Sequence, residues 1–270
     1  MHRVLACVAL ALAAQTAVAG TPCEGRAPSP ELSRLGMQMA DATRNALAHV
    51  DDDVVLIARM GQDLSRYRLT YSHIGFAVRE HPAGAWSVVH KLNTCGTDTS
   101  SLYDEGLLNF FSDSPSRYQA GIWRLAPDVQ TRLKKALLGK KARDYLEPHY
   151  SLVAYPFSTR YQNSNGWALE MLAFALAPED EANTRSTAQQ WLKASGYQPS
   201  ELDLGSLTRL GARVSKANVS FDDHPSELRW KGRIRTVTVD SIVNWLRTLP
   251  NGCQAMGCPE MRVELPAAAH

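Results

Sequence analysis

The sequence lacks any strong imbalance of charge. Its 270 residues carry 29 Lys and Arg against 27 Asp and Glu, which gives a formal net charge of +2. No basic stripe alternates with aromatic residues, and no glycine-rich loop of the phosphate-binding kind is present. Charge therefore gives no reason to expect a nucleic-acid partner or attraction to an anionic membrane.

A long apolar run is also missing. The apolar stretch at residues 4–14 is shorter than the roughly 20 residues that a transmembrane helix needs, and no later stretch approaches that length. It follows a short basic start and precedes Ala17-Val18-Ala19, an A-x-A cleavage signal. We therefore expect residues 1–19 to be a signal peptide and residues 20–270 to be a periplasmic or secreted protein without a transmembrane segment.

Cysteine is scarce, and only Cys23, Cys95, Cys253 and Cys258 remain after the leader. An even number of cysteines in an exported chain favours disulfides, and four cysteines allow three pairings. The short spacing favours a Cys253–Cys258 bond, which leaves Cys23 to pair with Cys95. A zinc site is less favoured, because no second cysteine pair or histidine pair has ligand spacing. We expect no metal and no cofactor.

Helical and strand-like patterns are mixed along the chain. Helices are expected at 31–49, 101–118, 128–138, 164–176, 184–194 and 241–249, and strands at 54–59, 71–78, 86–90, 122–125, 152–155, 219–221 and 234–239. The strands at 71–78 and 86–90 form an expected antiparallel hairpin with a turn at 81–84. Without repeats or a long linker, the pattern predicts a single α+β domain.

Three residues in this pattern suggest acyl chemistry. His73 lies on one strand of the hairpin, His90 lies on the next, and Ser164 begins a helix. A base, a residue that orients the base and a hydroxyl are the components of nucleophilic acyl transfer. In this hypothesis His73 is the base, His90 orients it and Ser164 attacks, because a serine hydroxyl is a weak acid that needs a well-placed base.

Each of these residues also has a structural interpretation. A histidine on an apolar strand is often a hydrogen-bonded core residue, and Ser164 or Asn163 at a helix start is often an N-cap. Glu170 is expected on the helix surface, with a hydrogen bond near the site as the alternative. Asp63 either lines the cleft or forms an Asx turn, with the turn favoured. The Asp222-Asp223-His224 cluster is better explained by a turn before Pro225 than by a metal site.

The order of these motifs resembles that of the circularly permuted papain-like hydrolases, which include lecithin:retinol acyltransferase-like enzymes and permuted NlpC-type peptidases. The resemblance rests on Tyr71-Ser-His-Ile-Gly75, Val88-Val-His90 and Asn163-Ser-Asn165. It implies an antiparallel sheet packed with helices, with His73 as base, His90 as the orienting residue and position 164 as nucleophile. The nucleophile of that clan is cysteine, so Ser164 departs from its pattern.

The chain more closely resembles an uncharacterised family of exported bacterial proteins, a domain of unknown function, from about Val54 to Leu249. The shared motifs are Gly61-Gln-Asp-Leu-Ser65, the His73 segment, Tyr103-Asp-Glu-Gly-Leu107, Asn109-Phe-Phe111, the Ser164 segment and Asp222-Asp-His-Pro225.

Two functions remain open. The first is a hydrolase or acyltransferase that acts on an amide or ester of the cell envelope, with Asp63, Asn163 and Asn165 binding a peptide or acyl ligand. The second is a non-catalytic binding or scaffolding protein that uses a degenerate papain-like site.

Overall fold

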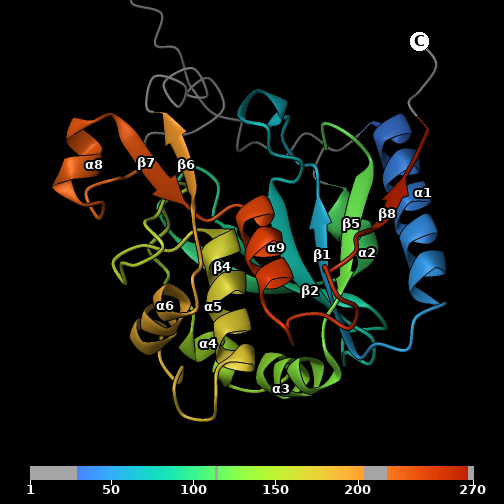
Figure 1. The fold of residues 1–270 in the computed structure, drawn as a ribbon. Helices are drawn as coiled ribbons and strands as arrows, with labels where there is room; N and C mark the ends of the chain where they lie inside the picture. The colour runs from blue at the N-terminus through green and yellow to red at the C-terminus, as the bar shows by residue number, and fades with distance from the viewer. Residues whose placement is uncertain (1–28, 113–114, 204–217, 267–270) are drawn as a thin grey trace, which may run out of the picture.

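A six-stranded antiparallel sheet forms the centre of the fold in the computed structural model, which describes residues 29–112, 115–203 and 218–266. The strand order is β4-β3-β2-β1-β5-β8 (Figure 1). The strands are β1 Val54–Arg59, β2 His73–Val78, β3 Ser87–Asn93, β4 Ser100–Glu105, β5 Gln119–Arg124 and β8 Met261–Glu264. A separate two-stranded sheet pairs β6 Ser200–Asp203 with β7 Arg233–Thr236.

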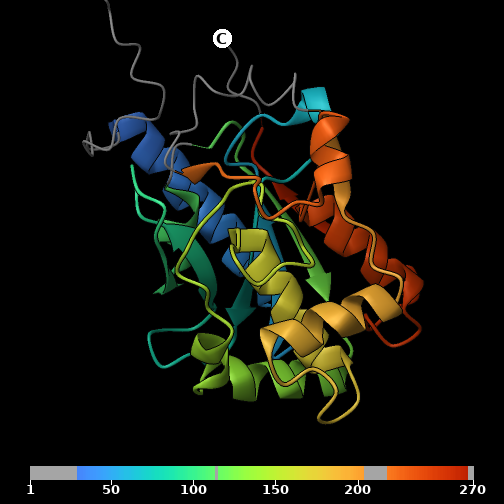
Figure 2. The same cartoon turned by 90° about the vertical axis from the view of Figure 1, so that its left-hand side faces the viewer.

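Helices cover both faces of the large sheet. They are α1 Pro30–Leu47, α2 Leu107–Phe111, α3 Pro127–Leu137, α4 Lys141–Asp144, α5 Ser164–Leu176, α6 Arg185–Ala194, α8 Ser226–Trp230 and α9 Val239–Thr248, with a short 3-10 turn at Ser65–Tyr67. One apolar cluster joins the sheet to α3, α5 and α9, and a second joins it to α1 and α2. We call these two sides the α5 face and the α1 face; α1 and α9 lie on opposite sides of the sheet (Figure 2).

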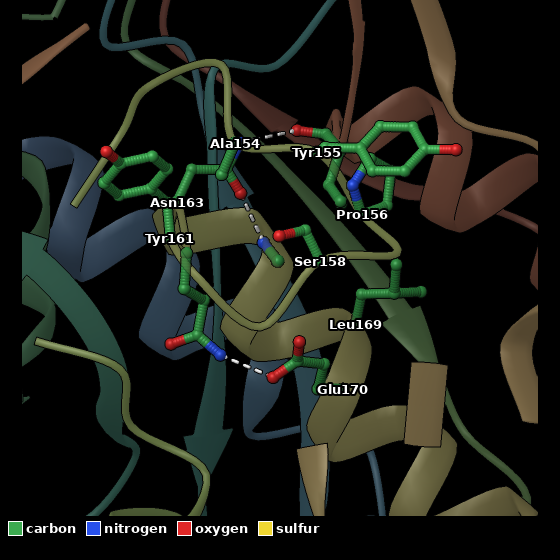
Figure 3. A pocket seen from close by; sticks show the side chains of 11 residues that line it. Ala154, Tyr155, Pro156, Ser158, Tyr161, Asn163, Leu169 and Glu170 are labelled. Carbon is green, nitrogen blue, oxygen red and sulfur yellow. Dashed lines mark hydrogen bonds between the residues drawn. The ribbon is translucent and has the colours of Figure 1, made fainter. Parts of the chain in front are cut away.

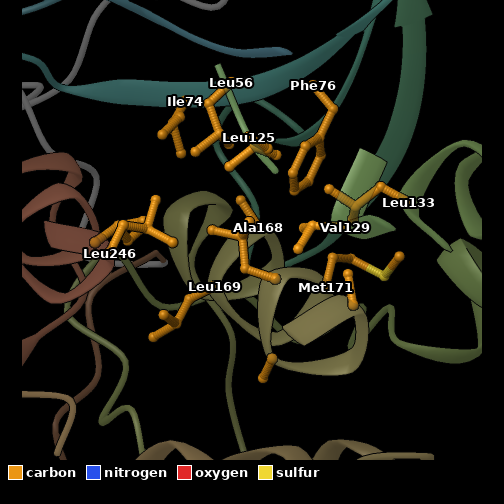
Figure 4. Close-up of a cluster of buried hydrophobic side chains, with 14 of the residues drawn as sticks. Leu56, Ile74, Phe76, Leu125, Val129, Leu133, Ala168, Leu169, Met171 and Leu246 are labelled. Atoms are coloured by element: carbon orange, nitrogen blue, oxygen red, sulfur yellow. The ribbon is translucent and has the colours of Figure 1, made fainter. Parts of the chain in front are cut away.

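Strand alternation assigns each side chain to one face. On β1, Leu56 packs on the α5 face, and its neighbour Ile57 packs on the α1 face. On β2, Ile74 and Phe76 share the α5 face with Leu56, and Figure 4 shows all three directed at the α5 helix. Because both faces of these strands are buried, their sequences are continuously apolar instead of alternating with polar residues.

The α5 helix is buried along almost its whole length. A helix that is apolar all round is typical of a core position between other elements. Its Trp167 ring lies 5.8 Å from the ring of Phe76 on β2, and the indole Nε1 donates a hydrogen bond to the Ala142 carbonyl. These contacts fix α5, and therefore its N-terminal residue Ser164, against the sheet.

Most predicted elements are present within a few residues of their expected bounds, and the mixed α+β class is confirmed. The prediction of a helix at 101–118 is wrong, because its first part forms the edge strand β4 and only Leu107–Phe111 is helical. The strands predicted at 152–155 and 219–221 are also wrong. These two segments run beside each other through isolated bonds, such as Leu152 N to Asn218 O, without a regular ladder.

The predicted Cys253–Cys258 disulfide is present. Cys95 is also disulfide-bonded, whereas Cys23 and the predicted signal peptide lie outside the described residues. None of the described helices is long and apolar enough to cross a membrane.

Candidate functional site

The two predicted histidines meet on the α1 face. His73 begins β2 and His90 lies on the neighbouring strand β3. His73 Nε2 lies 2.8 Å from His90 Nδ1, within hydrogen-bonding distance. The Phe110 ring of α2 covers both imidazoles, with its centroid 5.9 Å from that of His73 and 5.4 Å from that of His90. Both histidines are buried.

A carboxylate extends this pair into a chain of three groups. Glu105, the last residue of β4, has Oε2 3.1 Å from His90 Nε2. Its side chain is 24 % exposed, whereas the side chain of His90 is fully buried. We call His73, His90 and Glu105 the histidine relay. It runs across three neighbouring strands, from the interior toward the edge of the sheet.

Electrostatics decides where the protons of the relay lie. Burial lowers the pKa of His73 well below its usual value, and the charge of Arg59 lowers it further. Burial also lowers the pKa of His90, while the hydrogen bond to Glu105 opposes that shift. The bond from His90 lowers the pKa of Glu105. Near neutral pH both rings are therefore neutral, and Glu105 is an anion.

These charge states fix the tautomers. An ionised Glu105 only accepts hydrogen bonds, so His90 Nε2 carries the proton that it donates. His90 Nδ1 is then an acceptor, and His73 Nε2 donates to it. The remaining nitrogen, His73 Nδ1, is unprotonated, and it has no hydrogen-bond partner among the described residues. The relay therefore ends in a basic nitrogen.

Arg59 lies beside this nitrogen's ring. It is the direct partner of His73 on the β1–β2 ladder. Its Nη1 donates a 2.8 Å hydrogen bond to the Phe110 carbonyl, and its guanidinium lies 5.2 Å from the Phe110 ring centroid. A buried cation at this position opposes protonation of the relay.

Ser164 lies on the other side of the sheet. It is the first residue of α5, on the α5 face, whereas the two histidine side chains point to the α1 face. No hydrogen bond joins Ser164 to either histidine among the described residues. Its side chain instead bonds to Tyr150, whose pKa is raised by burial to about 12 while that bond opposes the rise. The structure thus brings together the predicted base and orienting residue, but not the predicted nucleophile.

Lys91, the neighbour of His90 on β3, points to the α5 face instead. Its fully buried ammonium donates three hydrogen bonds, to Glu147 O at 2.8 Å, Gln162 O at 2.7 Å and Gln162 Oε1 at 2.9 Å. Burial lowers the pKa of Lys91 to about 7. All three acceptors belong to the segment that leads into α5, so Lys91 fastens that segment to β3.

The asparagines on either side of Ser164 bind the protein itself. Asn163 is the N-cap of α5, with Oδ1 accepting from Gly166 N at 2.6 Å, and its amide nitrogen donates to Leu152 O at 3.1 Å. Asn165 Nδ2 donates to the Ser72 carbonyl at 3.4 Å. Asp63 accepts from Ser65 N at 3.0 Å, which is the favoured Asx turn.

A small pocket lies at the start of α5. Tyr155, Tyr161, Asn163 and Glu170 contribute to its lining (Figure 3). Its cavity volume of about 10 Å³ is enough for a single water molecule. In this state of the protein the pocket is therefore too small for a substrate.

Glu170 is not on the helix surface as predicted, because it is buried and paired with Arg185, whose Nε lies 2.8 Å from Oε2. Asp222, Asp223 and His224 lie in the favoured turn. No group of three or more metal-ligating side chains that could hold an ion is found within the described ranges.

The comparisons with known proteins agree with one sequence-based resemblance. No curated protein and no solved structure matches the chain. A family model matches residues 46–246, which is well over half of the sequence and includes the histidine relay and all of α5. The chain therefore belongs to the family described as an uncharacterized protein conserved in bacteria, DUF2145.

Proposed function

We propose that this protein is an exported hydrolase in which the histidine relay activates water for attack on an amide or ester of the cell envelope. The observation that carries the proposal is the continuous hydrogen-bonded chain from Glu105 through His90 to His73, which ends in an unprotonated Nδ1. A neutral imidazole oriented by a second group is the usual general base of hydrolytic enzymes. Export is supported by the Cys253–Cys258 disulfide, because such bonds persist in oxidising compartments.

In the proposed reaction His73 Nδ1 takes a proton from water as the water oxygen attacks the carbonyl carbon. The imidazolium that forms can pass its Nε2 proton toward His90 Nδ1, and the Glu105 carboxylate then stabilises the positive charge. Arg59 favours the oxyanion of the tetrahedral intermediate by charge attraction. His73 returns the proton to the leaving amine or alcohol, so water is the only co-reactant.

This proposal assigns Ser164 no chemical step, because its side chain and the relay lie on opposite faces of the sheet. The decisive experiment measures hydrolysis of muropeptides and short-chain esters by the wild type and four variants. We expect kcat/KM to fall roughly 10²–10⁴-fold in His73→Gln, the range typical of general-base catalysis. In Glu105→Gln we expect a smaller decrease in kcat/KM. Ser164→Ala and the surface control His149→Gln are expected to retain activity.

Labelling provides an independent measurement. A fluorophosphonate probe reacts with activated serines, so we expect no label on Ser164. Loss of hydrolysis in Ser164→Ala together with retention in His73→Gln would refute the relay mechanism and restore the serine hypothesis.

A binding or scaffolding role is the second candidate, and the separation of Ser164 from both histidines favours it. In that case the relay only stabilises the fold. The wild type would then bind muropeptides in calorimetry without cleaving them, and His73→Gln would lower the unfolding midpoint but leave the affinity unchanged. Cleavage by the wild type that depends on His73 excludes this candidate.

A further inference from the structure

The turn at Asp222–His224 contains a buried ion pair that the proposed reaction does not use. His224 Nδ1 lies 2.9 Å from Asp223 Oδ1, and both side chains are fully buried. The other ring nitrogen, His224 Nε2, lies 2.9 Å from the Arg235 carbonyl oxygen of β7. The Tyr155 ring packs against the imidazole with its centroid 5.2 Å away.

Both ring nitrogens of His224 therefore face an acceptor. A backbone carbonyl only accepts, and a carboxylate only accepts. One Asp223 oxygen faces the imidazole, and the other accepts a 2.8 Å hydrogen bond from the Tyr155 amide. Each of the two contacts of His224 is thus a hydrogen bond only when the ring nitrogen that makes it carries a proton.

The pair connects two segments that are distant in sequence. The first is residues 218–236, which contain α8 and β7, and the second is residues 151–156, which lead toward α5 and line its pocket. Besides the Asp223–Tyr155 bond, Leu152 N donates to Asn218 O at 2.9 Å and Thr236 Oγ1 donates to Ala154 O at 3.3 Å. We call this set of contacts the 151–156 clasp.

Removing one proton from His224 would break one of its two contacts. If Nδ1 lost the proton, the imidazole lone pair would face the buried Asp223 carboxylate. If Nε2 lost it, the lone pair would face the Arg235 carbonyl. Either arrangement places two acceptors against each other in a buried site, which costs the full desolvation of an unpaired group.

We propose that the Asp223–His224 pair is a proton-dependent latch, closed when His224 is doubly protonated and released when it loses one proton. Release frees Tyr155 from Asp223 and loosens the wall of the pocket at the start of α5. The pocket, which holds only a single water molecule when the latch is closed, then has room to open.

The charged side chains around His224 are paired with other groups. Asp222 binds Arg160 at 2.8 Å, and the Arg235 guanidinium binds Glu201 at 3.2 Å. Tyr155 is the remaining titratable side chain that faces the ring within the described ranges. Phenol ionises far above the range in which histidine titrates, so Tyr155 does not compete.

Hydrogen exchange measures the release directly. We expect the protection factors of the Leu152 and Tyr155 amides, corrected for the intrinsic exchange rate, to fall by up to 10-fold per pH unit as the latch is released with rising pH. His224→Gln is expected to show low, pH-independent protection at both amides. His149→Gln, which removes an exposed histidine beside the same segment, is the matched control and keeps the wild-type pH dependence.

Nitrogen NMR of the wild type tests the protonation state without any variant. We expect both ring nitrogens of His224 to give imidazolium-like signals near pH 6. When the pH is raised, one of the two nitrogens should lose its proton and change its signal. One unprotonated nitrogen throughout the pH range would overturn the proposal. Equal pH dependence of amide protection in the wild type and His224→Gln would overturn it as well.

Discussion

His73 and His90 share one hydrogen bond, 2.8 Å long, between two neighbouring strands, and the Phe110 ring packs against both imidazoles. Two imidazoles in such a site are stable only while they remain neutral, because two buried cations next to Arg59 would repel each other. The stability of the protein should therefore depend on their protonation.

We predict that stability falls as the pH drops below about 6.5. The unfolded histidines bind protons near that pH, whereas the pKa values of His73 and His90 in the folded protein are lowered. The unfolded state then binds more protons than the folded state. Each ring therefore lowers the free energy of unfolding by up to about 1.4 kcal/mol for each pH unit of acidification, until the ring is protonated in the folded state as well. Urea unfolding at pH 7.5, 6.5 and 5.5 measures this slope. A His73→Gln variant should have a smaller slope; an unchanged slope would contradict the assignment.

Glu170→Ala should destabilise the protein by about 3–5 kcal/mol, because it leaves Arg185 buried without its main partner. Arg185 contacts Glu170 through Nε at 2.8 Å, and the Arg185 side chain is only 10 % exposed. Glu201→Ala is the control, since Glu201 pairs with exposed arginines and such pairs contribute at most about 1 kcal/mol. Chemical denaturation compares the two variants. Equal losses would show that the Glu170 pair behaves like a surface ion pair.

Asn163→Ala should lower the free energy of unfolding by more than the loss of an ordinary N-cap does. The cap itself contributes about 1 kcal/mol, and the variant also leaves the Leu152 carbonyl and Thr236 hydroxyl without the Asn163 amide, at about 1–3 kcal/mol for a buried unsatisfied group. Thr184→Ala removes the exposed N-cap of α6 and should cost only the first amount. The difference in urea midpoint between the variants is the measurement, and a difference near zero would show that water replaces the lost amide.

Replacing Cys253 and Cys258 together by alanine should lower the free energy of unfolding by about 2 kcal/mol, the chain-entropy value for a loop this short. The β8 strand begins three residues after Cys258 and pairs with β5. Increased hydrogen exchange should therefore appear in β8 before the rest of the sheet. Unchanged exchange there would mean that pairing with β5 holds β8 without the disulfide.

Side-chain periodicity predicted the elements whose apolar residues face one surface. It located α1, α3 and α6, and the β2–β3 hairpin that joins His73 to His90, because a strand buried on both faces has a continuous apolar run. It could not locate Glu105. The edge strand β4 is mostly polar and exposed, so its apolar residue Leu102 matched a helical spacing with Leu107, the first residue of α2. A glutamate on an expected helix gave no reason to pair it with a strand histidine.

The face of the sheet on which Ser164 lies could not be predicted from the sequence, for a different reason. The motif order correctly placed two histidines on adjacent strands and a serine at a helix start. Motif order does not state which face of the sheet the helix covers, however. That face is set by the packing of Phe76 on β2 against Trp167 on α5, two residues that lie far apart in the sequence and among many other apolar residues.

His90 and Lys91 are neighbours on β3, and they serve opposite faces of the sheet. One binds Glu105 and His73, and the other fastens the chain ahead of α5. A single-codon insertion or deletion within β3 would exchange them, sending an ammonium toward Arg59 and an imidazole toward the Gln162 carbonyl. During evolution this strand can accept conservative replacements at its apolar positions, but a change in its length by one residue would disable both polar centres at once.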